Sequence, residues 1–177
     1  RLITFPGAQD DVPDAGVKFL KTDGVYRRSQ GQDNPKEAQF VADRVIHHFD
    51  TRPGKSVGVV AMSAAQREAI LNALVMKRTS RPDLDEKFVE SRLDGLFVKS
   101  LEDVQGDERD VIIMSIGYGP DETGIVYRNF GPINKKGGER RLNVAITRAK
   151  ELTEVVSSMT AGDRKSTRLN SSHANIS

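Results

Sequence analysis

Two short stretches hold most of the residues in this chain that could do chemistry. "SLEDVQGDERDVII" (100–113) crowds carboxylates around a glycine, and "GGERRLNVAITRAKE" (137–151) places three arginines and a lysine on a predicted helix. A guanidinium is always charged, and its fork of donors matches a carboxylate or a phosphate. The second stretch is therefore the first place to look for a bound anion.

The arginines of the second stretch favour a partner. On a helix over 139–150, the apolar face would be formed by Leu142, Ala145, Ile146 and Ala149, which leaves Arg140, Arg141, Thr147, Arg148 and Lys150 for other roles. Arg140 and Arg141 lie in the first turn, where a cation opposes the helix macrodipole at a cost of a few tenths of a kcal/mol. That cost indicates carboxylate or phosphate partners. The alternative is a solvated basic face.

The acidic stretch is less specific by itself. It carries five carboxylates between two apolar runs: Glu102, Asp103, Asp107, Glu108 and Asp110. Gly106 permits a tight turn and a close approach of the backbone. A solvated acidic turn would explain the same pattern, so the isolated stretch does not decide a function.

Composition excludes several classes of protein. The 177 residues suffice for one α/β domain with a buried core. There is no cysteine, which rules out disulfides and thiolate metal sites, and we predict no metal ligand in this chain. The adjacent His47 and His48 face different directions on a helix, so they do not easily bind one metal ion, and we expect both at the surface. No apolar run is long enough to span a bilayer, and the first residues do not resemble an export signal. We therefore expect a cytoplasmic protein with no membrane partner.

The last fifteen residues distort the charge balance. "DRKSTRLNSSHANIS" (163–177) back-translates into a sequence that resembles a common sequencing-library adapter; the alternative is a polar disordered tail. Without Asp163, Arg164, Lys165 and Arg168, the basic and acidic totals fall from 27 and 25 to 24 each. We expect a neutral domain over 1–162 and a disordered tail after it, so basicity does not indicate function.

Periodicity predicts an α/β fold. Apolar residues recur at helical spacing over 34–50, with Asn34 as N-cap and Pro35 in the first turn, and over 63–78. Short β-branched runs at 16–21, 56–62, 96–100, 110–116 and 153–159 predict strands. This alternation indicates a mainly parallel sheet covered by helices on both faces. Ligands of such sheets gather at the carboxyl ends of the strands.

Taken together, the two stretches resemble motifs V and VI of superfamily 1 DNA/RNA helicases, in the branch of senataxin-like and RNA-surveillance enzymes. "SVGVVAMSAAQREAIL" (56–71) resembles motif IV, and the likeness covers roughly residues 1–160. It implies a RecA-like three-layer domain of the P-loop NTPase fold. Members use two such domains, which bind ATP between them and move along single-stranded DNA or RNA.

The resemblance assigns roles residue by residue. Arg148 matches the arginine finger on the γ-phosphate, and Glu108 matches the acid that binds the ribose. The other nucleotide-site positions that it implies are Gln105 and Gly106 of motif V, Arg141 and Asn143 of motif VI, and the motif IV pair Gln66 and Arg67. Ser63 and Ser100 match positions that contact the nucleic-acid backbone.

A phosphate-binding loop is missing from this sequence. No G-x-x-x-x-G-K-[ST] occurs, and "RPGKS" (52–56) lacks the leading glycine, so we expect it to be a plain turn. The resemblance therefore implies the second RecA-like domain, with the loop lysine and the Mg²⁺ ligands on the missing first domain. The isolated chain should not hydrolyse ATP. Two other functions stay open: a non-motor nucleic-acid-binding module, and an ATPase switch that does not unwind strands.

Overall fold

The computed structural model describes residues 15–159. In chain order, the elements in this range are β1 (Gly16–Lys21), α1 (Pro35–Thr51), β2 (Val57–Ala61), α2 (Ala64–Ser80), the 3₁₀ segment η1 (Pro82–Phe88), β3 (Phe97–Ser100), β4 (Arg109–Ser115), the 3₁₀ segment η2 (Gly131–Asn134), α3 (Gly138–Ile146) and β5 (Ala149–Ser157). The predicted tail 163–177 and the predicted domain limits at 1 and 162 lie outside the described residues.

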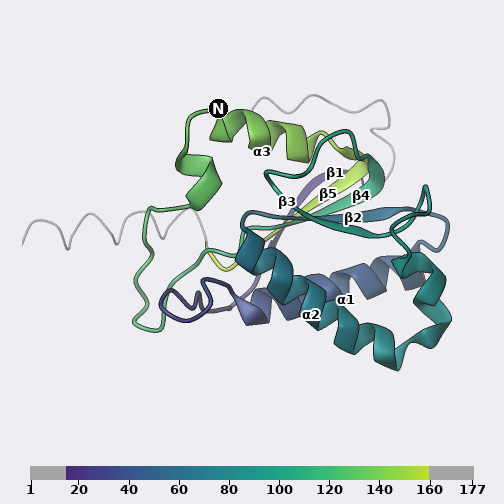
Figure 1. Ribbon diagram of the computed structural model, residues 1–177, viewed down its shortest axis with the longest axis horizontal. Helices are drawn as coiled ribbons and strands as arrows, with labels where there is room; N and C mark the ends of the chain where they lie inside the picture. The colour runs from purple at the N-terminus through teal and green to yellow at the C-terminus, as the bar shows by residue number, and fades with distance from the viewer. Residues whose placement is uncertain (1–14, 160–177) are drawn as a thin grey trace, which may run out of the picture.

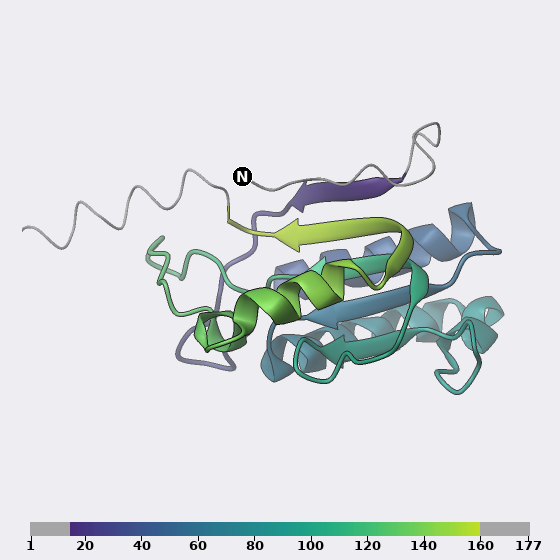
Figure 2. The same cartoon turned by 90° about the horizontal axis from the view of Figure 1, so that it is seen from above.

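The five strands of the described part form one parallel sheet in the order β1-β5-β4-β2-β3. Helices α1 and α2 cover one face, and α3 covers the other (Figure 1). Seen from above, β1 lies at one edge of the sheet (Figure 2). The predicted three-layer α/β architecture with a parallel sheet is confirmed.

Two apolar clusters hold the three layers together. All five residues of β2 are buried, as expected for a central parallel strand covered on both faces. Val59 and Ile113 face α1 and α2, whereas Val60 and Ile112 face the α3 side, where Ala145 packs. The continuous β-branched runs in the sequence therefore reflect burial on both faces of the sheet.

Both long helices begin as the sequence predicts. The side chain of Asn34 accepts a hydrogen bond from the Glu37 amide at 3.1 Å, and Pro35 follows in the first turn. Ser63 caps α2 by accepting a hydrogen bond from the Gln66 amide at 3.1 Å. These caps fix where both helices meet the carboxyl ends of the strands.

The arginine-rich helix is shorter than predicted. α3 ends at Ile146, so Arg148 lies in the turn beyond the helix and Ala149 begins β5 rather than extending the apolar helix face. The carbonyl of Arg148 accepts a hydrogen bond from the Arg109 amide at 3.1 Å, and Ala149 pairs with Arg109. Because this backbone pairs with β4, it cannot also form the hydrogen bonds of a longer helix.

His48 also departs from expectation, because surface positions are predicted for both adjacent histidines. Its side chain is 2% exposed, and its Nε2 atom lies 3.2 Å from the carboxylate of Glu154.

Residues 15–159 contain no helix that is both long and apolar enough to cross a membrane.

Candidate functional site at the amino end of the sheet

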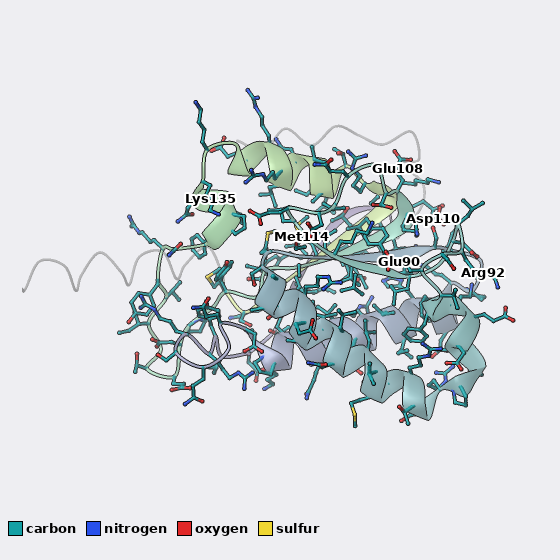
Figure 3. The ribbon with its side chains drawn as sticks, in the orientation of Figure 1. Glu90, Arg92, Glu108, Asp110, Met114 and Lys135 are labelled. Carbon is teal, nitrogen blue, oxygen red and sulfur yellow. The ribbon has the colours of Figure 1, made fainter. Side chains whose placement is uncertain are left out.

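Four of the predicted site residues are divided between the two ends of the sheet. Glu108 and Arg148 precede the first residues of β4 and β5, whereas Ser63 and Ser100 lie where β2 and β3 end. We call these edges the amino end and the carboxyl end. In Figure 3, Glu108 lies toward the same end as Asp110 near the start of β4, and Lys135 lies toward the opposite end.

Glu108 and Arg148 are neighbours across two adjacent strands. Arg109 pairs with Ala149 in the parallel register, so the residues that precede them occupy equivalent positions at the amino end. The bond from the Arg109 amide to the Arg148 carbonyl fixes this arrangement. The structure therefore brings together the acid of the first stretch and the arginine of the second, which are separated by forty residues of sequence.

Two guanidinium groups of the second stretch, Arg148 at the amino end and Arg141 in the first turn of α3, have atoms without partners. Nε of Arg148 and Nη1 of Arg141 are both buried, and neither has a hydrogen-bond partner within the part of the chain that the structure describes. A buried donor without a partner costs about 1–3 kcal/mol, and more when it is charged. Such groups fit an anionic ligand or a carboxylate from another domain.

The end of α3 is held rigidly behind Arg148. The amide of Arg148 donates to the Ala145 carbonyl at 3.2 Å, and the hydroxyl of Thr153 donates to the Ile146 carbonyl at 3.2 Å. Ala145 is fully buried against the sheet. Arg148 therefore projects from a short turn whose two ends are fixed to the core.

The crossover from β3 to β4 carries Gln105, Gly106 and Glu108 in exposed positions. Buried Leu101 and Val104 fix its first half to the core. Gly106 has a φ of 76°, a backbone conformation that favours glycine, and there is open space around it. The crossover spans the sheet, so these residues come near Arg148 only at its last position, Glu108.

The segment "RPGKS" is a turn, as predicted, and lies at the same amino end. Asp110 accepts hydrogen bonds from the amide and the hydroxyl of Ser56, both at 2.8 Å. Burial would raise the pKa of Asp110, but these bonds and the charges of Lys55 and Lys150 lower it. The carboxylate therefore remains ionised and anchors the turn next to the start of β4.

Asn143 lies on the exposed side of α3. Arg67 lies in α2 on the opposite face of the sheet, where its Nε donates to the Val98 carbonyl at 3.0 Å. The structure therefore pairs Glu108 with Arg148 but does not place Asn143 or Arg67 beside them.

Gln66 lies at the carboxyl end, in a buried polar cluster. Its Nε2 donates to Ser115 Oγ at 3.1 Å, and its Oε1 accepts from the Asn34 amide at 2.8 Å. The side chain is fully buried. Ser63 caps α2, and the Ser100 hydroxyl donates to Asp103 at 2.5 Å. These three predicted positions already have partners within the chain.

The centre of that cluster is a residue that the sequence analysis does not select as a site. Glu37 is fully buried and accepts hydrogen bonds from Ser115 Oγ at 2.8 Å, the Gly117 amide at 2.7 Å and Ser158 Oγ at 3.3 Å. Burial raises the pKa of Glu37 to about 7. Its sequence signal, an acid in the first turn of a helix, is also that of an ordinary capping position.

Comparison with known proteins defines the family. The AAA domain family matches residues 7–160, which is most of the chain. The chain belongs to the AAA domain family. Membership agrees with the RecA-like α/β fold predicted from the sequence and described above.

Two curated proteins resemble this AAA domain closely. One, from Mycoplasma pneumoniae, is named an uncharacterized ATP-dependent helicase and is 40% identical over 149 residues, which cover 80% of this chain and 12% of the relative. The other, of the same description from Mycoplasma genitalium, is 39% identical over 138 residues, covering 75% and 12%. The chain thus spans about an eighth of the length of these relatives.

A solved structure also resembles this AAA domain. It is described as the C-terminal domain of a possible DNA helicase from Lactobacillus plantarum, and it superposes with a TM-score of 0.46 at 16% identity. The superposition covers 81% of this chain and 73% of that one.

Proposed function

We propose that this chain is the second RecA-like domain of an ATP-dependent superfamily 1 helicase. In this role it supplies Arg148 to the γ-phosphate and Glu108 to the ribose of ATP, which a first domain with a phosphate-binding loop holds. The chain also forms part of the track for single-stranded DNA or RNA. Its relatives of 39–40% identity are named as ATP-dependent helicases, which supports this proposal.

The observation that carries the proposal is the buried Nε of Arg148, which has no partner in residues 15–159. A protein rarely leaves a buried charged donor unpaired unless a ligand or another domain completes it. A phosphate fits this requirement, because a guanidinium binds two of its oxygens and stabilises charge that develops during phosphoryl transfer. A structural basic face would instead have its donors in water.

Glu108 complements Arg148 in charge and position. It is exposed at the neighbouring strand, and an ionised carboxylate accepts hydrogen bonds from two hydroxyl groups. An acceptor for sugar hydroxyls beside a donor for phosphates suits a nucleotide better than a simple anion. A non-motor binder of nucleic acid would not need the pair.

The chain does not itself offer a cradle for the phosphates. It lacks the phosphate-binding loop, and "RPGKS" forms a turn that is fixed by hydrogen bonds from Ser56 to Asp110. No group of three or more histidine or acidic side chains within 15–159 is placed to hold a metal ion. The proposal therefore assigns the loop lysine and the Mg²⁺ ligands to the first domain.

The test is Arg148→Ala in a longer protein that carries this domain together with a phosphate-binding loop. We expect kcat for ATP hydrolysis to fall by about 10³–10⁵, with ATP and single-strand affinities retained. Arg148→Lys should restore little, because an ammonium cannot form the forked contact. Val144→Ala, on the exposed side of the preceding helix, is the matched control for disturbance of α3.

Retention of more than about a tenth of the hydrolysis rate by Arg148→Ala would rule out the finger assignment. Strand-displacement assays on the same protein separate a helicase from an ATPase switch. A protein that hydrolyses ATP on single strands yet displaces none would support the switch.

A further inference from the structure

One buried arginine links Glu108 to the loop that precedes β3. Arg109, the first residue of β4, is 8% exposed. Its Nη1 donates to the carbonyl of Glu108 at 2.8 Å, and its Nε donates to the carbonyl of Gly95 at 2.9 Å. Glu90, in the loop that ends at Gly95, lies toward the same end of the molecule as Glu108 (Figure 3). The guanidinium group therefore joins two segments of the chain at the amino end of the sheet.

The guanidinium group rests on the ring of Phe97. Its Cζ lies 5.0 Å from the ring centroid, within the range of a cation–π contact. Phe97 is fully buried and pairs with Gly58 of β2, where a Cβ would come within 2.4 Å of the ring. This close approach leaves the ring no room to shift, so it supports Arg109 from a fixed position.

The second anchor of Arg109 is also fixed. A Cβ at Gly95 would come within 1.9 Å of the Val89 carbonyl oxygen, so the loop closes tightly on itself. The amide of Gly95 donates to the Arg92 carbonyl at 3.0 Å. The carbonyl that accepts from Arg109 therefore belongs to a loop that is hydrogen-bonded internally.

The main chain of Arg109 contacts the other residue of the site. Its amide donates to the Arg148 carbonyl at 3.1 Å, and the register of β4 on β5 shifts between the pairs of Arg109 and Val111. Irregularities of this kind re-aim side chains and are common next to active sites. The main chain of Arg109 thus makes the contact to Arg148, and its side chain makes the contact to Glu108.

The burial of this charge needs an explanation beyond packing. A guanidinium group costs more to bury than an apolar side chain of similar volume. The crossover that ends at Glu108 turns through Gly106, which has a φ of 76° and open space around it. Lys99 Nζ donates to Asp107 at 2.8 Å through two long side chains, whereas Arg109 binds the carbonyl of Glu108 itself. The side chain of Arg109 therefore fixes the backbone from which the Glu108 carboxylate projects.

We propose that Arg109 is a positioning residue, which holds Glu108 so that its carboxylate faces the ribose of ATP. The inference deepens the proposed function and rests on it, because it requires Glu108 to bind the ribose. Arg109 itself does not contact the nucleotide in this role. It acts on nucleotide affinity through Glu108 alone.

The test uses the longer protein that carries this domain together with a phosphate-binding loop. Arg109→Met keeps an apolar stem against Phe97 and removes both donors. We expect KM for ATP to rise about fivefold with little change in kcat, because the ribose contact stabilises the ground state and the transition state nearly alike. Arg109→Lys keeps the charge without the fork of donors and should recover part of this loss. It also provides the comparison where Arg109→Met does not fold.

A double variant separates positioning from a structural role. In a protein that already carries Glu108→Ala, Arg109→Met should change KM by less than about twofold, because no carboxylate is left to position. Arg44→Met is the control, since it removes a part-buried arginine that binds Glu154 on the other face of the sheet. It should lower the melting temperature and leave KM for ATP unchanged.

The outcomes distinguish this inference from the proposed function. If Glu108→Ala raises KM and Arg109→Met does not, the inference is wrong and the proposed function stands. An equal rise in KM with and without Glu108 would also overturn the inference, because Arg109 would then act through the fold. If Glu108→Ala itself leaves KM unchanged, the ribose contact is wrong, and the positioning role with it.

Discussion

The two ends of the sheet differ in how their polar groups are satisfied. At the carboxyl end, buried Glu37, Gln66 and Asn34 find all their partners within the chain, across α1, α2 and the ends of β4 and β5. Arg148 at the amino end, and Arg141 in the first turn of α3, instead keep buried donor atoms without partners in the described range. The first arrangement serves folding, and the second requires something from outside.

This difference predicts opposite responses to mutation. Removing a group from the carboxyl end should cost stability, because its former partners stay buried and unpaired. Removing a group from the amino end should cost activity and leave stability nearly unchanged.

The largest stability effect is expected at Glu37. Glu37→Leu leaves the Ser115 hydroxyl, the Gly117 amide and the Ser158 hydroxyl without their acceptor. We expect the free energy of unfolding to fall by about 3–5 kcal/mol, measured by urea denaturation. Glu37→Gln keeps one acceptor oxygen and should lose less. A change below about 1 kcal/mol for Glu37→Leu would contradict the structural role of the cluster.

The pH dependence of stability tests the same carboxyl end. The pKa of Glu37 is raised from 4.5 to about 7 in the fold. The folded state thus holds the proton more tightly, so this contribution is complete below pH 4.5 and is lost as pH rises to 7. We expect wild type to lose roughly 3 kcal/mol relative to Glu37→Gln across that interval.

Urea denaturation of both proteins at several pH values measures this difference, since other titrating groups cancel between them. Glu154, whose pKa is lowered to about 2, acts below this interval, where its contribution is lost as pH falls from 4.5. Parallel curves for wild type and Glu37→Gln between pH 4.5 and 7 would show that Glu37 is ionised throughout.

At the amino end, Glu108→Ala should act on ATP binding in the longer protein. Contacts to the ribose stabilise the ground state and the transition state nearly alike, so KM for ATP should rise about tenfold with little change in kcat. Steady-state kinetics separate the two constants. A collapse of kcat at constant KM would place Glu108 closer to the reacting phosphate than the ribose.

The smallest effect is expected for Arg141→Leu on the stability of the 177-residue chain. Its Nη1 is buried without a partner, so replacement by an apolar side chain removes a desolvation cost along with the charge. The free energy of unfolding should change by less than about 0.5 kcal/mol or increase. A loss above about 2 kcal/mol would mean that Arg141 has a structural partner, which would weaken the contrast with the satisfied polar groups of the carboxyl end.

Particular residues show how far the sequence could be interpreted. Asn34 and Pro35 begin α1 where their capping chemistry predicts, because a cap depends on neighbours three residues away. α2 begins within one residue of its predicted start at Ser63. The predicted end of the arginine-rich helix at residue 150 was wrong, because the helix end depends on the pairing of Ala149 with Arg109. These two residues lie forty positions apart in the sequence. His48 was misplaced for the same reason: its burial requires β5 to pack against α1.

The sequence by itself determined the alternation of strands and helices, both helix starts and the motifs that carry Arg148 and Glu108, since all of these rest on local periodicity and short-range chemistry. Only the tertiary structure decided that these two residues meet at the amino end, and that Gln66 and Ser63 lie at the other. The parallel register decides this, because it aligns residues that are distant in sequence. Some of their buried polar atoms are thereby hydrogen-bonded, and others have no partner within the described residues.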